Sequence, residues 1–308
     1  MNEEIKQIID GIGNIILGKG REVRLVITCL LAGGHLLIED IPGMGKTTLA
    51  HAIARTMDLD YSRIQFTSDL LPADVVGVSV FNSEHKTFQF HKGPVFAQMV
   101  LADELNRATP RTQSALLEAM EERQVSVDGD THRLPEPFFV IATQNQRHHV
   151  GTFPLPESQL DRFLMRIHLG YPDFQAERQL LTGQSRSDIL RKTEAVITVE
   201  RLLQLQQEVR EIFVSDAILD YIQDLLGKSR NNSQQYLGLS PRAGIALLLA
   251  AKAWALTEGR DMVMPEDVQA VAGSVLEHRL DPEGTRIKGS EYRASRHLIQ
   301  MVSINPSA

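Results

Sequence analysis

Cysteine is almost absent from this sequence, which has 308 residues and a single cysteine, Cys29. One cysteine excludes a disulfide within the chain. Cys29 stands in the apolar segment VITCLLA, which predicts a buried structural thiol rather than a reactive one. Membrane spans are also missing, because no stretch offers about 18 uncharged apolar residues. The best candidates are interrupted by Arg24, by Gly33-Gly34 or by Lys252.

An excess of positive charge is missing as well. Lysine and arginine number 32 against 39 aspartates and glutamates, which gives a formal net charge of −7. This balance argues against a nucleic-acid-binding surface that covers the whole molecule, although it leaves room for a local basic loop. The N-terminal segment MNEEIKQ is acidic and lacks the apolar centre of a signal peptide. We therefore expect a cytoplasmic protein.

A phosphate-binding loop is the feature around which the chain is organised. Residues 36–38 predict a buried strand, and the turn PGMG leads from it into a helix that begins at Lys46. Glycines let successive backbone N–H groups point at one anion, and the new helix adds the positive end of its dipole. Lys46 would reach the β- and γ-phosphates, and Thr47 would help hold Mg²⁺. The expected nucleotide-binding residues here are Pro42, Gly43, Met44, Gly45, Lys46, Thr47 and Thr48.

An acidic strand end forms the second chemical centre. The segment QMVLADE predicts a buried parallel strand that presents two carboxylates at its carboxyl end. Asp103 is the natural candidate for Mg²⁺, through a coordinated water, and Glu104 is placed to orient or deprotonate the attacking water. Strands that end in solvated acids are common. The phosphate loop upstream is therefore what favours the catalytic interpretation.

A polar amide follows a further predicted strand, FFVIA, which ends in TQN. If that strand neighbours the acidic one, Asn145 would hydrogen-bond the γ-phosphate or the lytic water. A simple loop asparagine fits the same pattern equally well.

The chain divides into a strand-containing part and a helical part. Polar turns between alternating apolar residues predict β-hairpin insertions near residues 78–92 and 124–134. The segment YPD then marks a boundary, beyond which the apolar spacing predicts only helices and a polar tail. We expect an α/β nucleotide-binding domain with a parallel sheet over residues 1–172 and a smaller all-α domain over 173–308. The predicted helices of the second part cover about 173–183, 199–211, 215–229, 241–258 and 265–279.

One of these helices carries a cation in an unusual place. Ser240 is its predicted N-cap and Pro241 its first residue, so Arg242 falls in the first turn. A positive charge there opposes the helix dipole. Arg242 is therefore expected to serve an anionic group.

Taken together, residues 35–280 resemble an AAA+ ATPase of the MoxR family. PGMGKT resembles the Walker A motif, VLADELNRA resembles Walker B, and FFVIATQN resembles the sensor-1 strand with Asn145. LPESQLDRF resembles the segment that bears the arginine finger, here Arg162, and GLSPRA resembles sensor 2, here Arg242. Asp40 replaces the first Walker glycine, and Gln146 stands where the family usually has proline. Neither departure alters a group that does chemistry.

The resemblance implies a P-loop αβα core with a helical lid, and ATP with Mg²⁺ between them. Thr47 and Asp103 would hold the metal, Glu104 would polarise water and Asn145 would position it. The turn that contains Leu17 and Gly18 corresponds to one near the adenine.

Two arginines are expected to complete the chemistry. In the family, Arg162 would serve the neighbouring subunit, which requires a head-to-tail ring, most often a hexamer. Arg242 would report the nucleotide state to the lid.

The resemblance also implies a chaperone-like remodeller of protein partners, typically with a von Willebrand A domain protein. Relatives of the same clade grip DNA with the two hairpins, so a nucleic-acid motor or loader is the alternative. The second hairpin, QVSVDGDTHRL, carries two aspartates that would repel phosphates, which favours protein substrates. A third hypothesis is a ring that only switches conformation to scaffold a partner. A hydrolysis rate that stays very low when the partner is added would favour it.

Overall fold

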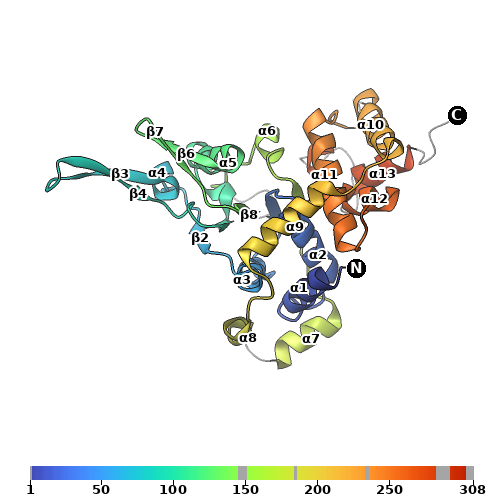
Figure 1. Cartoon of the computed structure of the whole chain (residues 1–308), viewed down its shortest axis with the longest axis horizontal. Helices are drawn as coiled ribbons and strands as arrows, with labels where there is room; N and C mark the ends of the chain where they lie inside the picture. Colours follow the sequence, from blue (N-terminus) through green and yellow to red (C-terminus); the bar gives the residue numbers. More distant parts are fainter. Residues whose placement is uncertain (1, 145–150, 184–185, 233–235, 282–291, 303–308) are drawn as a thin grey trace.

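A computed structural model describes residues 2–144, 151–183, 186–232, 236–281 and 292–302 of the chain. Its centre is a five-stranded parallel sheet with the strand order β2-β5-β8-β1-β9 (Figure 1). Because the strands are parallel, all their carboxyl ends meet at one edge, here named the carboxyl edge, and all their starts meet at the opposite amino edge. The strands are β1 (Leu36–Glu39), β2 (Tyr61–Gln65), β5 (Met99–Asp103), β8 (Phe139–Gln144) and β9 (Met165–Ile167).

Alternate residues of the strands fill two separate cores. Leu101 and Ile141 belong to the larger core with the helices α1 (Glu3–Gly13), α2 (Gly20–Leu31) and α3 (Lys46–Thr56). Val100 and Val140 belong to the second core, which α5 (Pro110–Glu122) covers and which α4 (Pro72–Val76) borders. This alternation is the two-residue period of a strand buried on both faces. The predicted α/β class with a parallel sheet is confirmed.

Two antiparallel hairpins are attached to the second face. The strands β3 (Gly77–Asn82) and β4 (Thr87–Lys92) form the longer one, which projects from the body in Figure 1. The shorter one joins β6 (Gln124–Val127) to β7 (Asp130–Arg133). Phe90 of the first stacks on His132 of the second, with ring centroids 4.0 Å apart, so the hairpins support each other.

The helical part follows β9 and packs against that edge strand and against α2 and α3. Its helices are α7 (Phe174–Thr182), α8 (Arg186–Lys192), α9 (Val199–Glu211), α10 (Asp216–Asn231), α11 (Pro241–Thr257), α12 (Pro265–Leu280) and α13 (Arg293–Gln300). The sequence pattern did not predict α8 or α13. The first backbone groups of α13 are capped from another helix, because Glu277 accepts from the N–H groups of Ala294 and Ser295. Such a cap leaves no local sequence signal.

The N-terminal helices join the two parts. Arg24 of α2 lies over the ring of Trp254, 3.8 Å from its centroid, and pairs with Glu258 at 2.6 Å. Arg201 of α9 pairs with Glu4 of α1 at 2.8 Å. At the far edge of the sheet, α12 packs against β9.

None of the helices in the described part of the chain combines the length and apolarity needed to cross a bilayer.

Candidate functional site

The loop between β1 and α3 has the backbone that phosphate binding requires. Gly43 and Gly45 have φ angles of 88° and 86°, in the left-handed region that glycine adopts without strain. No heavy atom lies within 4 Å of the place where a Cβ would stand on either glycine, so the loop borders open space. The helix α3 begins at Lys46, and its first N–H groups have no acceptor within the helix. Loop and helix together form a cradle for an anion.

Lys46 is buried at the bottom of this cradle. Its Nζ donates to the carbonyl oxygens of Asp40 at 2.7 Å and Ile41 at 3.1 Å. Burial lowers the pKa of Lys46, whereas the nearby carboxylates of Asp40, Asp103 and Glu104 raise it. The ammonium group therefore lies close to both acids of the second centre. Phosphate oxygens can take the place of the two carbonyl groups.

Asp40, which replaces the consensus glycine, turns its carboxylate toward backbone donors. Its Oδ2 accepts from the N–H groups of Leu169 at 2.8 Å and Gly170 at 2.6 Å, and its Oδ1 accepts from Ile41 at 2.9 Å. These bonds join the phosphate loop to the chain that leaves β9. The carboxylate thus has a structural use that the sequence motif did not indicate.

The acids at the end of β5 are held by a threonine from the neighbouring strand. Thr143 of β8 donates its hydroxyl to Asp103 Oδ1 at 2.7 Å and accepts from the backbone N–H of Glu104 at 2.9 Å. The other oxygen of Asp103 accepts from Arg63 of β2 at 2.7 Å. Oxygen ligands such as the Asp103 carboxylate and the Thr47 hydroxyl suit Mg²⁺, so the residues fit the predicted metal.

Glu104 has a strained backbone and a held side chain. Its φ of 57° lies in the left-handed region, which non-glycine residues adopt mainly at functional sites. Its Oε2 accepts from Gln65 at 3.1 Å and from Arg107 at 2.8 Å. The sequence argument missed Arg63, Gln65 and Thr143. The spacing of Arg63 and Gln65 was the available signal, since residues two apart in a strand point the same way.

The turn at Leu17 and Gly18 packs against the segment that follows β9. Gly18 has a φ of 71°, and a Cβ on it would lie 2.9 Å from the Cβ of Ala176. The next residue, Lys19, donates to the carbonyl of Tyr171 at 2.7 Å. Tyr171 belongs to the linker between β9 and α7, and it directly follows Leu169 and Gly170, whose N–H groups bind Asp40. The structure therefore brings the turn, the loop and the linker together.

Arg162 and Arg242 lie at the amino edge, opposite the phosphate loop. Arg162 NH2 is 2.9 Å from Glu121 Oε2, and Arg242 NH1 is 3.2 Å from Glu121 Oε1. Glu121 lies in the last turn of α5 near the start of β1, where His35 Nε2 contacts the carbonyl oxygen of Met120 at 3.2 Å. Both arginines are thus placed at the start of the strands.

Arg242 was expected to report the nucleotide state to the lid, and the structure places it beside Arg162 rather than beside Lys46. This position accompanies the packing of α12 of the helical part against β9 and α6 (Glu157–Leu160).

A buried arginine of α12 holds the segment that carries Arg162. Arg279 donates to Asp161 Oδ1 at 2.6 Å, to the Asp161 carbonyl at 3.1 Å and to the Phe163 carbonyl at 2.9 Å. Burial lowers the pKa of Arg279, while Asp161 raises it. Sequence reasoning missed this residue, because an arginine in the last turn of a helix is an ordinary partner of the dipole.

Asn145, together with Gln146, lies outside the described residues. The preceding Gln144 is buried and donates to Glu39, which also pairs with Arg166 at 3.1 Å.

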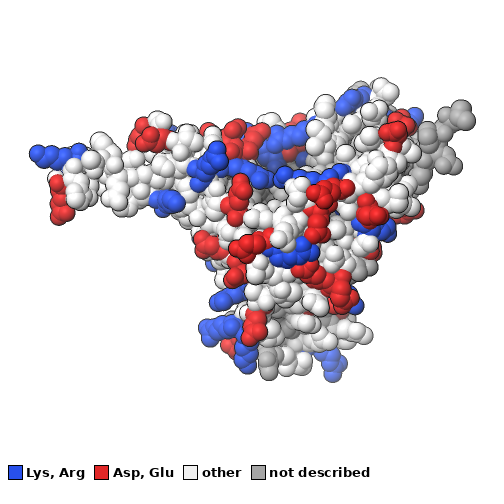
Figure 2. Space-filling model, in the orientation of Figure 1, with Lys and Arg blue, Asp and Glu red and all other residues white. Residues whose placement is uncertain are grey.

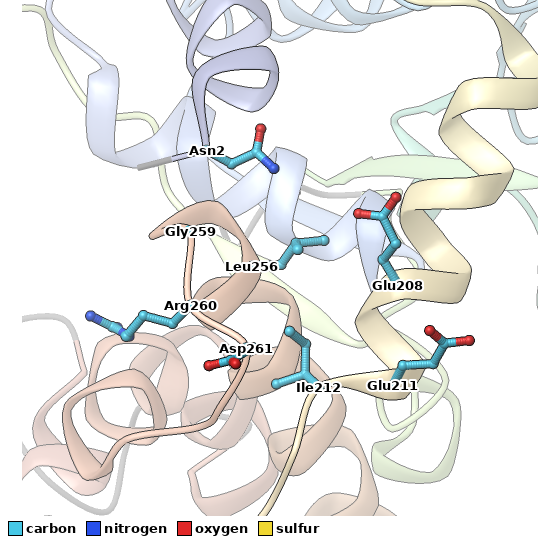
Figure 3. Close-up of a pocket in the computed structure, with 8 residues that line it drawn as sticks. All are labelled: Asn2, Glu208, Glu211, Ile212, Leu256, Gly259, Arg260 and Asp261. Atoms are coloured by element: carbon cyan, nitrogen blue, oxygen red, sulfur yellow. The ribbon is translucent and has the colours of Figure 1, made fainter.

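A cavity of about 330 Å³ lies apart from all these residues, between the ends of α9 and α11 and the start of α1 (Figure 3). Figure 3 shows the Arg260 side chain pointing away from the other lining side chains. It pairs with Asp267 of α12. No residue of the phosphate loop or of the acidic strand lines this cavity, so it is not the nucleotide site. Its lining consists of Asn2, Glu208, Glu211, Ile212, Leu256, Gly259, Arg260 and Asp261.

Comparison with known proteins gives a consistent result. Residues 35–165 match the ATPase family associated with various cellular activities (AAA), and residues 227–295 match the AAA lid domain. The chain is 47% identical over 272 residues to the uncharacterized protein YeaC of Bacillus subtilis, which covers 88% of this chain and 85% of that protein. It is 40% identical over 285 residues to the chaperone MoxR1 of Mycobacterium tuberculosis, with coverages of 90% and 75%.

Two further similarities point the same way. The protein MoxR of Paracoccus denitrificans is 33% identical over 293 residues, which cover 87% of this chain and 86% of that protein. A crystal structure of a candidate ATPase from Cytophaga hutchinsonii is 36% identical and has a TM-score of 0.86. It covers 99% of this chain and 96% of that one.

Proposed function

Because the chain belongs to the MoxR family of AAA+ ATPases and hydrolyses ATP, we propose that it works as a head-to-tail hexameric ring that remodels protein partners. Each active site in this proposal lies between two subunits. Residues 1–172 form the nucleotide-binding domain, and residues 173–308 form the helical lid and tail.

The position of the arginines at the amino edge supports this proposal most strongly. Lys46 and the two acids lie at the carboxyl edge, whereas Arg162 and Arg242 meet Glu121 at the amino edge. With about 3.3 Å per residue, the six residues of β8 separate the two edges by roughly 20 Å. That distance exceeds the reach of a side chain. Head-to-tail stacking would lay the amino edge of one subunit on the carboxyl edge of the next.

The residues of the carboxyl edge would bind ATP and activate water. The loop N–H groups and Lys46 would hold the phosphates, and the turn at Leu17 and Gly18 would contact the adenine. Mg²⁺ held by Thr47 and Asp103 would neutralise charge on the phosphate oxygens. Glu104 would orient the attacking water once it exchanges its bond to Gln65 for one to that water.

Further groups would act on the terminal phosphate. Asn145 of the same subunit would position the attacking water. Arg162 of the neighbour would stabilise the charge that develops on the transferred group, a contribution that in other NTPases reaches about 10³ to 10⁵ in rate. Because Arg242 shares a carboxylate with Arg162, we assign it to the same neighbouring site.

Protein clients are favoured over nucleic acid by the hairpins. Phe81 and Phe88 form an edge-to-face pair on the longer hairpin and are 53% and 73% exposed. The turn of the shorter hairpin exposes Asp128 and Asp130, which would repel a phosphate backbone. Figure 2 shows acidic and basic side chains interspersed over the face that it presents. A von Willebrand A domain protein is the partner that we propose.

A trapping experiment tests the choice of client. Glu104→Gln should bind ATP without hydrolysing it and so retain bound partners. We expect the variant, purified from native lysate with ATP, to carry a von Willebrand A domain protein that is absent from a Lys46→Ala control. Recovery of nuclease-sensitive DNA or RNA instead would contradict the proposal and support a nucleic-acid motor.

A mixing experiment tests the shared site. Arg162→Ala and Glu104→Gln should each be inactive alone, one for lack of the finger and the other for lack of the acid. Mixed rings should regain ATPase activity, because a subunit with an intact acid then meets a neighbour with an intact finger. Mixtures as inactive as the separate variants would contradict an active site between subunits.

A further inference from the structure

We propose that Glu121 is a positioning residue for the two arginines that serve the neighbouring active site, an inference that rests on the function proposed above. Glu121 stands in the last turn of α5 and is one-third exposed. One of its oxygens binds Arg162, from the segment before β9, and the other binds Arg242, from the first turn of α11. A single carboxylate therefore sets the separation of two guanidinium groups from different parts of the fold.

The charges around Glu121 explain why it is needed. Arg279 pairs with Asp161 Oδ1 at 2.6 Å, and Arg242 Nε lies 3.9 Å from Asp161 Oδ2. Three arginines thus share two carboxylates. Without the charge of Glu121, only the carboxylate of Asp161 would remain to balance the three arginines. Arg162 and Arg242 would then repel each other.

Arg242 would respond first to that repulsion. Its side chain is 48% exposed, whereas that of Arg162 is 28% exposed. The segment of Arg162 is also fixed by the hydrogen bonds from the buried Arg279. Removal of the Glu121 charge is therefore expected to release Arg242 into solvent and to leave Arg162 without its side-chain partner.

The geometry of a guanidinium group lets Glu121 keep its contacts during catalysis. Each arginine has five N–H donors, and the bonds to Glu121 occupy the NH2 group of one and the NH1 group of the other. Each arginine thus keeps further N–H groups that could bind the oxygens of a terminal phosphate. Glu121 thus acts through the arginines and touches no substrate itself.

The variant Glu121→Gln tests this role, because it preserves the shape of the side chain and removes its charge. We expect kcat for ATP hydrolysis to fall about tenfold or more, as for other groups displaced from a catalytic geometry. The KM for ATP should stay within about twofold, since the nucleotide of the same subunit lies at the other edge of the sheet. Glu122→Gln is the matched control, because Glu122 is exposed on the same helix end and takes no part in the described cluster. It should keep the full rate.

Mixing separates positioning from damage to the fold. When Glu121→Gln chains are mixed with Glu104→Gln chains, activity should return, because the intact acid of the first meets the intact arginine cluster of the second. A folding defect, or a fault in the nucleotide site of the same chain, would not be repaired in this way. Unchanged or raised activity of Glu121→Gln alone, or a mixture that stays inactive, would overturn the proposal.

The mixture of Arg162→Ala with Glu104→Gln chains distinguishes the role of Glu121 from the active site between subunits. If that mixture regains activity and the Glu121→Gln mixture does not, only the role of Glu121 is wrong. If the Arg162→Ala mixture also fails, the active site between subunits is wrong as well.

Discussion

Arg162 and Arg242 meet on one carboxylate, that of Glu121, at 2.9 and 3.2 Å, although one precedes the last strand of the sheet and the other opens a helix of the lid. The two arginines are thus one charged unit at the amino edge. A movement of the lid would displace both groups relative to a neighbouring nucleotide. In the proposed ring, the position of the lid is therefore coupled to ATP hydrolysis in the neighbouring subunit.

Thr143 offers a test of the acidic centre. Its hydroxyl bridges Asp103 and the backbone of Glu104, and the residue is fully buried. Thr143→Val keeps the shape but removes both bonds, so the acids lose their fixed geometry. We expect kcat to fall by about 10- to 100-fold with little change in ATP affinity. Steady-state ATPase assays and ATP titration check this, and Thr143→Ser, which keeps the hydroxyl, should retain most of the rate.

Asp40 offers a test of the loop anchor. Asp40→Ala would leave the N–H groups of Leu169, Gly170 and Ile41 without their acceptor. The free energy of unfolding should fall by about 2–4 kcal/mol, and ATP should bind more weakly because the loop is no longer held. Chemical denaturation and ATP titration measure the two effects. Asp40→Asn retains one acceptor oxygen and should lose less. Equal stability of Asp40→Ala and the unmodified chain would contradict the anchoring role.

His35 predicts how stability changes with pH. Burial lowers the pKa of His35 from 6.5 to about 4 in the folded chain. The unfolded chain therefore binds a proton at a higher pH than the folded chain does. The contribution of His35 is fully present above pH 6.5 and is lost progressively as the pH falls toward 4, up to about 3 kcal/mol.

Denaturation between pH 7 and pH 4 checks this sign. His35→Gln should flatten the decline, since an amide can accept from Val140 and donate to Met120 without titrating. An equally steep decline in the variant would show that other groups, such as the buried His278, account for the loss.

The phosphate loop and the acidic strand could be predicted from the sequence because their chemistry is local. Asp103 ends β5, and Gly45 and Lys46 lie where the loop after β1 passes into α3. The surroundings of Asp40 and Glu104 could not be predicted, since their partners come from other strands.

The position of Arg242 could not be predicted from the sequence for a related reason. It depends on how the lid packs on the sheet, and that packing rests on contacts such as Arg279 to Asp161, which are 118 positions apart. A helix start predicts an anionic partner for Arg242. It does not predict which edge of which subunit supplies that partner.

The most direct test of the account is ATPase activity in a mixture of Arg242→Ala and Glu104→Gln chains. If Arg242 serves the neighbour, as its bond to Glu121 indicates, activity absent from each variant alone should return on mixing. If Arg242 serves the nucleotide of its own subunit, every chain in the mixture lacks either the acid or the arginine at its own site. The mixture would then stay inactive, and that result would contradict the assignment.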